Sequence, residues 1–348
     1  MRYQRVCLES LTYTLPDEVV TTTEIEARLA PLYQRLRLPE GRLELMTGIR
    51  ERRFWPCDML PGEKSVESGR RALERAEIDP SVVGALIHGS VCRDYLEPAT
   101  ACGVHHHLGL GPRCAVYDVS NACLGLMSGV VQAANMIELG QIQAALIVGT
   151  ESGRGLVETT IDYLNSNGSL SRQDIKPAVA SLTIGSGSAA ILLTDLAISR
   201  SRRRLLGGVV RARTDQCHLC RSGRDEAAGA EMRPLMNTDA ETLLNEGVAA
   251  GKAAFADFLT EVGWRANDVA KTICHQVGRA HQKLLFDELG LNPEIDFSTF
   301  EYLGNTGAVA LPITAAIAAE QGHVQSGDKV ALMGIGSGIN VIILAVQW

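Results

Sequence analysis

The chain repeats one pattern of secondary structure, once in each half. Residues 114–152 with 183–195 form the first copy, and residues 297–348 form the second. In each copy, an apolar strand leads through a tight turn into a helix of small apolar residues, which ends at a glycine, Gly140 or Gly322. Another strand, a GSG turn and a final apolar strand follow. The repeat therefore predicts a duplicated α/β unit.

The strands of the repeat are apolar almost throughout, which is typical of sheets that are buried on both faces. We therefore expect mainly parallel sheets covered by helices. Residues 84–90 and 271–277 add a further matched pair of strands. The first half is expected to span residues 1–199, and the second residues 200–348. The stretch 200–250 is rich in Arg, Asp and Glu and is expected to be an insertion over the sheet.

Composition narrows the class of protein. The 348 residues are 46% hydrophobic and carry a formal net charge of -7, so a large core is expected and nucleic acid is an unsuitable partner. No signal peptide is visible, and nine cysteines without one favour a reduced, cytoplasmic protein. The uncharged stretch 330–348 contains Gly, Ser and Asn, which indicates two buried strands and no membrane span.

Two groups of potential metal ligands are expected to bind no metal. Cys217 and Cys220 form one CxxC pair without a second pair to complete a zinc site. His105, His106 and His107 are adjacent, so regular structure cannot turn all three toward one ion.

The first strand-to-helix turn carries Cys123, in the motif DVSNACLG. At a helix N-terminus, the helix dipole and the free N–H groups favour a thiolate, which is the nucleophilic form of cysteine. We therefore expect a lowered pKa at Cys123. A small buried cysteine without a catalytic role fits this position equally well.

The second half carries Asn305 at the equivalent turn and His275 at the end of a matched strand. If the halves pack about a pseudo-twofold axis, Cys123, His275 and Asn305 converge, and the histidine and amide can donate hydrogen bonds to a developing oxyanion. Taken singly, His275 also fits a core histidine, and Asn305 also fits an Asx turn. The turn Gly334–Gly338 offers backbone N–H groups for a second oxyanion hole with the amide of Cys123.

These motifs resemble the thiolase superfamily, and within it the ketoacyl-ACP synthase III type. The resemblance rests on TGIRERR, DVSNACLG, ICHQVGRAH, LGNTGAVALP and GIGSGINV, which occur in the family's order. It implies a five-layered α/β/α/β/α fold, a homodimer and ping-pong chemistry on acyl thioesters, with no cofactor beyond the substrates. Cys123 would accept the acyl group, His275 and Asn305 would stabilise an enolate, and the N–H groups of Cys123 and Gly338 would form the first oxyanion hole.

A narrower likeness connects SVCRDYLEPATA, LCRSG and LLNEG to the OleA-type enzymes of olefin biosynthesis. This likeness implies condensation of two acyl-CoA molecules without decarboxylation, to a β-keto acid. A plain acyl-CoA needs a base to remove an α-proton, and Glu97 falls where these enzymes carry a glutamate that reaches the neighbouring subunit's site. A surface glutamate before Pro98 is the alternative interpretation.

Three other functions stay open from the sequence. A synthase that decarboxylates a malonyl group on acyl carrier protein would not need Glu97. An acyl-binding protein with this fold would form no adduct at Cys123. A thiolase usually has a second cysteine in its C-terminal GSG region, where this chain has Ser337 and Gly338. The unusual segment 217–231 leaves chain length and carrier open.

Overall fold

The computed structural model describes residues 1–223 and 235–348. Ten strands form one mixed sheet in the order β12-β11-β13-β14-β8-β1-β7-β6-β4-β5. The strands of the first half are β1 Val6–Thr14, β4 Val83–His88, β5 Ala115–Asp118, β6 Ala144–Glu151 and β7 Gly187–Asp195. Those of the second half are β8 Arg204–Ala212, β11 Lys271–Cys274, β12 Asp296–Phe297, β13 Lys329–Gly336 and β14 Asn340–Gln347.

The two sets of five strands have the same internal arrangement, which confirms the duplicated α/β fold. In the first half, β7 is antiparallel to both β1 and β6, whereas β4 is parallel to β6 and β5. In the second half, β14 is antiparallel to both β8 and β13, whereas β11 is parallel to β13 and β12. The sets join where Cys7 of β1 pairs with Arg204 of β8. The predicted boundary at residues 199 and 200 stays a prediction.

The expectation of mainly parallel sheets was wrong, because half of the pairings in each set are antiparallel. In the second half, the GSG turn connects β13 directly to β14 as a hairpin, and a hairpin makes its two strands antiparallel. The same stretch confirms the prediction of two buried strands within residues 330–348. Among the described residues, no helix is both long enough and apolar enough to cross a membrane.

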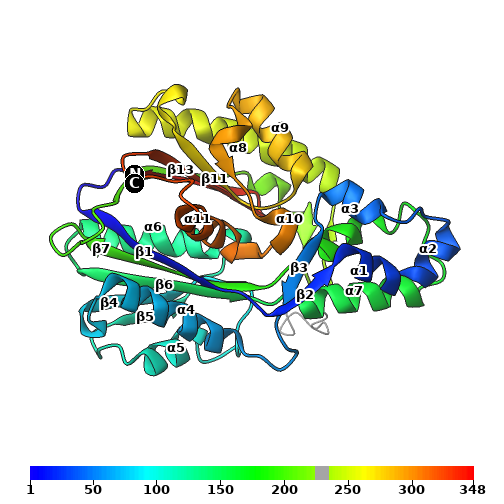
Figure 1. Ribbon diagram of the computed structural model, residues 1–348, viewed down its shortest axis with the longest axis horizontal. Helices are drawn as coiled ribbons and strands as arrows, with labels where there is room; N and C mark the ends of the chain where they lie inside the picture. Colours follow the sequence, from blue (N-terminus) through cyan, green and yellow to red (C-terminus); the bar gives the residue numbers. More distant parts are fainter. Residues whose placement is uncertain (224–234) are drawn as a thin grey trace.

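Helices and strands form five layers (Figure 1). The central layer consists of α6 Gly125–Glu138 and α11 Ala310–Glu320, which lie between the two halves of the sheet. Helices α4 Pro61–Ala76 and α5 Thr100–Leu108 cover the outer face of the first half. Helices α8 Ala240–Val262 and α9 Arg279–Leu289 cover the outer face of the second half. Both central helices end as predicted, with Gly140 and Gly322 at positive φ after their last turns.

The interpretation of residues 200–250 as an insertion was wrong for both ends of this stretch, and residues 224–234 within it lie outside the described residues. Its beginning is β8, a strand inside the sheet, and its end is the first half of α8, which packs on β8 and β14. The charged residues of β8 and of the first half of α8 lie at the ends and on the solvent side of these elements. Arg211, for example, is exposed and pairs with Asp257 of α8.

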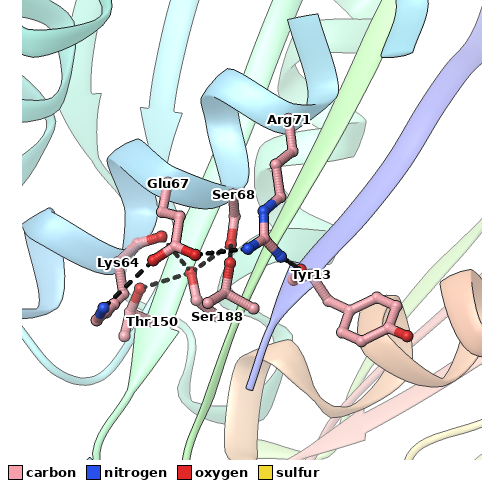
Figure 2. A network of polar contacts seen from close by, with 8 residues as sticks. Tyr13, Lys64, Glu67, Ser68, Arg71, Thr150 and Ser188 are labelled. Atoms are coloured by element: carbon pink, nitrogen blue, oxygen red, sulfur yellow. Dashed lines mark hydrogen bonds and ion pairs between the residues drawn. The ribbon is translucent and has the colours of Figure 1, made fainter. Parts of the chain in front are cut away.

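Helix α4 contacts the first half of the sheet through buried hydroxyl groups as well as apolar side chains (Figure 2). Ser65 contacts Thr150 at 2.8 Å, Ser68 donates to Ser188 at 2.9 Å, and Thr150 donates to Ser188 at 2.8 Å. On the solvent side of the helix, Arg71 pairs with Glu67 at 2.6 Å. Because each buried hydroxyl has a partner, the network fixes the position of α4 against the end of β6.

A smaller region covers one end of the sheet, where Figure 1 shows it at the right. It has its own apolar core, which includes Ile25, Leu32, Phe54 and Ile161. Its elements are β2 Glu18–Thr21, β3 Glu51–Phe54, α1 Thr22–Arg28, α2 Ala30–Leu36, α3 Arg42–Thr47 and α7 Arg154–Ser166. The remaining short elements are β9 Cys220–Arg221, β10 Asn237–Thr238, α10 Phe300–Leu303 and the 3₁₀ helices η1 Pro80–Val82, η2 Ala122–Leu124, η3 Lys176–Thr183, η4 Thr214–Gln216, η6 Ala266–Asp268, η7 Pro293–Ile295 and η8 Gly307–Val309.

Candidate active site

Cys123 lies in η2, a single 3₁₀ turn that leads directly into α6. The residue before it, Ala122, has a φ of 43°, which is uncommon for a residue other than glycine. Gly125, at the start of α6, lies so close to Gly89 that a Cβ atom there would be 2.6 Å from the Gly89 carbonyl oxygen. The sharp turn therefore presents a partly buried thiol at the carboxyl end of β5, where the sequence placed it.

The expected lowering of the Cys123 pKa was wrong. Burial raises the pKa of this thiol to about 12, and the neighbouring Glu151 carboxyl group and the Cys220 thiol raise it further. The short helical turn offers too little stabilisation to outweigh the loss of water and the nearby negative charge. At neutral pH the residue is therefore a thiol, and a nucleophilic role would require loss of its proton during the attack.

Asn305 occupies the equivalent turn of the second half. Its side-chain Oδ1 accepts a hydrogen bond from the N–H of Gly307 at 3.0 Å, so it does form the Asx turn that was one interpretation. Its backbone is fixed as well, because its N–H donates to Thr183 and its carbonyl accepts from Gly185, both at 2.9 Å. The Asx turn and a catalytic role are compatible, since the oxygen is held by the turn and the Nδ2 group remains as a donor.

The two turns meet across the centre of the molecule. The turn of Cys123, η2, packs against η8, which directly follows Asn305. Asn340 after the GSG turn donates to Asn121 at 3.0 Å, so a hydrogen bond ties the Cys123 turn to the second half. A Cβ atom at Gly336 would lie 3.5 Å from the amide nitrogen of Cys123 and 3.2 Å from Leu124, so the GIGSG turn lies directly beside η2. The oxyanion hole formed by Cys123 and Gly338 stays a prediction.

His275 follows β11, and its N–H donates to Met333 of β13 at 2.9 Å. It is buried, and burial together with the neighbouring His281 lowers the pKa of its imidazole to about 3. The ring is therefore neutral at physiological pH and retains one N–H donor. His275 and His281 line a small cavity with Gly334 and Ile335, at the end of β13 that leads toward Cys123.

Gln276 connects His275 to the segment that leads to Asn305. Its Oε1 accepts from the N–H groups of Thr299 at 2.7 Å and Phe300 at 3.1 Å, at the start of α10. Its Nε2 donates to the carbonyl of Cys274 at 2.6 Å. One buried amide thus ties the residue before His275 to the start of α10, the helix that precedes Asn305.

We expect Gln276→Leu to lower the free energy of unfolding by about 3 kcal/mol, because it leaves two buried N–H groups and one carbonyl without partners. Urea denaturation measures this change. Gln321→Leu is the matched control, since Gln321 is exposed after α11 and its replacement should change stability by about 0.5 kcal/mol or less. A similar small effect at both positions would contradict the role assigned to Gln276.

Glu97 lies apart from the other predicted residues. It is exposed, on the loop between β4 and α5, and no contact within the described residues joins it to Cys123, His275 or Asn305. Its neighbours Tyr95 and Leu96 are 58% and 65% exposed, which is high for large apolar side chains. The sequence did not indicate this exposed apolar surface around Glu97.

One buried acidic group beside these turns was not predicted from the sequence. Glu151, the last residue of β6, is 5% exposed and lies against the turn of Asn305, where a Cβ atom at Gly307 would be 3.2 Å from its carboxyl carbon. Burial raises its pKa. The available signal was a glutamate at the end of an apolar strand, in VGTES, at the edge of the sheet where the turns of Cys123 and Asn305 are expected.

Family comparisons agree with this arrangement. Residues 61–167 match the model of the thiolase N-terminal domain, and residues 259–348 match that of the 3-oxoacyl-[acyl-carrier-protein] synthase III C terminal. An acyl-CoA:acyl-CoA alkyltransferase of Shewanella oneidensis is 43% identical to the chain, with 100% of both covered. A protein of the same name from Xanthomonas campestris is 33% identical over 100% of both.

The chain belongs to the OleA family. A crystal structure of Xanthomonas campestris OleA with a glutamate replaced by alanine superposes with a TM-score of 0.93 at 32% identity, and covers 100% of this chain and 99% of that one. A second OleA structure, with a cysteine replaced by serine and with bound lauric acid and lauroyl-CoA, has a TM-score of 0.92 at 33% identity, and covers 99% and 100%. The protein is thus a thiolase-superfamily condensing enzyme, and the five-layered fold is confirmed. Residues 224–231 of the unusual segment 217–231 lie outside the described residues.

Proposed function

We propose that this OleA-family chain joins two acyl-CoA molecules by a Claisen condensation without decarboxylation. The contact between the Cys123 turn and the Asn305 turn carries this proposal, in a chain that is 43% identical over its full length to an acyl-CoA:acyl-CoA alkyltransferase. That contact supports a single site to which one half brings a nucleophile and the other half brings hydrogen-bond donors.

In the first step, the sulfur of Cys123 attacks the thioester carbonyl of one acyl-CoA, and CoA leaves as its thiol with the proton lost by Cys123. The N–H groups of Cys123 and Gly338 stabilise the oxyanion of the tetrahedral intermediate. The acyl group is then held as a thioester on Cys123. Neutral His275 suits the next step, because its uncharged ring keeps one N–H group that can donate a hydrogen bond.

In the second step, the carboxylate of Glu97 removes an α-proton from a second acyl-CoA. His275 and Asn305 donate hydrogen bonds to the enolate oxygen that forms. The α-carbon attacks the acyl carbonyl on Cys123, a carbon–carbon bond forms, and the bond to sulfur breaks. Water then cleaves the remaining thioester, which gives a β-keto acid and CoA.

Glu97 performs its role in the site of a second copy of the chain. The exposed Tyr95 and Leu96 beside it suit burial in an interface, and β5, at the edge of the sheet, leaves one row of backbone groups available for pairing. A homodimer would bring the Glu97 loop of one copy to the Cys123 of the other. The expected cytoplasmic location and the expected lack of a cofactor stay predictions, as does acyl carrier protein as a further partner.

Intact-protein mass spectrometry after incubation with lauroyl-CoA alone tests this function, with Cys123→Ala in parallel. We expect an adduct of one lauroyl group on the wild-type chain and no adduct on the variant. The same samples should contain free CoA and a β-keto acid of doubled chain length, or the ketone formed from it. An adduct that gives product only after addition of malonyl-ACP would identify the decarboxylating synthase instead, and no adduct with any thioester would exclude Cys123 as nucleophile.

A further inference from the structure

The carboxyl group of Glu151 accepts hydrogen bonds from two segments that approach the candidate active site from different halves. Its Oε1 accepts from the N–H of Val91 at 3.0 Å and from that of Ala308 at 3.3 Å, and its Oε2 accepts from the N–H of Cys92 at 3.3 Å. Val91 and Cys92 begin the loop that carries Glu97, whereas Ala308 lies in η8, directly after Asn305. One buried side chain thus joins the loop that carries Glu97 to the turn that follows Asn305.

The position of Glu151 is itself fixed from several sides. Trp55 donates its indole N–H to the Glu151 carbonyl at 3.2 Å. The preceding residue, Thr150, accepts from Ser90 through its carbonyl at 2.6 Å and is bound through its hydroxyl to the network under α4 (Figure 2). A carboxyl group held this firmly can determine where its partners lie.

Among the described residues, Glu151 is also a carboxyl group whose charge acts on Cys123. The groups that face the thiol and titrate are Glu151 at the end of β6 and Cys220 of β9, and the thiol of Cys92 lies beside Glu151. The charge of Glu151 disfavours ionisation of Cys123, because two like charges at short range in a buried site disfavour each other.

We propose that Glu151 is a positioning residue of the condensing site, which ties the loop of Glu97 to the turn of Asn305 through the hydrogen bonds of its buried carboxyl group. This assignment rests on the proposed function, because it takes Glu97 and Asn305 as members of the site. A separate electrostatic effect, in which the charge of Glu151 disfavours ionisation of Cys123, does not depend on the proposed function.

Two variants separate the contributions of charge and hydrogen bonding. Glu151→Gln keeps an acceptor for Val91 and Ala308 but removes the charge, and Glu151→Ala removes both. The pH midpoint for alkylation of Cys123 by iodoacetamide, followed by mass spectrometry, should fall by about one unit in both variants, so alkylation at a fixed pH below the midpoint becomes about tenfold faster. Condensation of lauroyl-CoA should fall about 100-fold in Glu151→Ala, and acylation of Cys123 should fall less than tenfold.

Glu9→Gln is the matched control. Glu9 is also a buried glutamate, and its carboxyl group accepts from the N–H groups of Arg200 and Ser201 in a loop after β7. The Glu9→Gln variant should leave the pH midpoint for alkylation of Cys123 unchanged. Thermal unfolding of all variants checks that they fold. An unchanged midpoint in Glu151→Gln would overturn the electrostatic assignment. Equal losses of acylation and condensation in Glu151→Ala would overturn the positioning assignment. Because iodoacetamide is no thioester, the midpoint is informative even if the proposed function fails.

Discussion

Glu97→Ala is expected to lower the rate at which two acyl-CoA molecules condense by about 1,000-fold, while Cys123 still acquires an acyl group. Removing a general base that transfers a proton in the transition state typically costs between about 100-fold and 10,000-fold. The first step needs no α-proton to be removed, so the adduct at Cys123 should form at an unchanged rate. Quantifying the adduct and the β-keto product in the same reaction measures both steps.

Mixed dimers show whether Glu97 acts in its own subunit or in a partner. We expect Cys123→Ala and Glu97→Ala chains, each inactive alone, to recover about a quarter of the wild-type rate after they are unfolded together and refolded. About half of the dimers are then mixed, and one of the two sites in each combines an intact Cys123 with the intact Glu97 of the other copy. No recovery would mean that Glu97 does not serve the neighbouring site.

Glu74→Ala is the control for the loss of an exposed glutamate, because Glu74 is exposed on α4, and it should keep the full rate. Glu97→Gln should match Glu97→Ala, since an amide cannot accept the proton, and Glu97→Asp should retain part of the rate. Full condensation by Glu97→Gln would exclude this carboxylate as the base.

Acid should destabilise the fold well above the pH at which most carboxylates titrate. His88, His275 and His281 are buried, and burial lowers their pKa values to about 4, 3 and 4. An unfolded histidine binds a proton near pH 6.5, whereas the folded residue does not. The contribution of these neutral histidines to the free energy of unfolding is therefore fully present above about pH 6.5. It falls as the pH decreases toward the folded pKa, by up to about 1.4 kcal/mol per pH unit for each histidine.

Buried carboxyl groups oppose part of this loss. Burial raises the pKa of Asp296 to about 6, so the folded state takes up this proton first and gains stability as the pH falls from 6 toward 4. The pKa values of Glu151 and Asp94 are raised by burial too, and these groups act in the same direction. We therefore expect a net fall of about 2 kcal/mol per pH unit between about pH 6 and pH 5.

His88→Leu tests this expectation without touching the proposed site. Neither ring nitrogen of His88 has a hydrogen-bond partner among the described residues, and Asp118 is 4.0 Å away. Free energies of unfolding from urea titrations at pH 7, 6 and 5 should show a slope smaller by about 1.4 kcal/mol per pH unit in this variant. His106→Leu should keep the wild-type slope, because His106 is exposed on α5. An unchanged slope in His88→Leu would contradict the assignment.

The repeat in the sequence predicted the fold because apolar strands and small-residue helices fix which faces are buried. The repeat did not predict which strands are antiparallel, or that residues 200–250 begin with a strand of the sheet and end in a helix. There, the charges near β8 and α8 masked a strand and a helix whose apolar sides lie in the core. The meeting of the Cys123 and Asn305 turns followed from the two matched halves, and the structure brings them together as expected.

Two features of the site lay beyond the reach of sequence patterns. The pKa of Cys123 is raised by burial and by the charge of Glu151, which is 28 residues away in sequence. The sequence indicates a helix start, but it does not indicate how much water reaches that start. Gln276 is the second feature, since its three hydrogen bonds depend on where α10 lies relative to β11.

The matched halves of the sheet have a consequence for symmetry. Identical halves related by a twofold axis would set like groups opposite each other, a thiol facing a thiol or an amide facing an amide. Here the corresponding turns carry Cys123 and Asn305, and the corresponding strands end near His88 and His275. Because the two unlike copies are fused in one chain, a near-symmetric framework presents a cysteine on one side of its axis and an asparagine on the other.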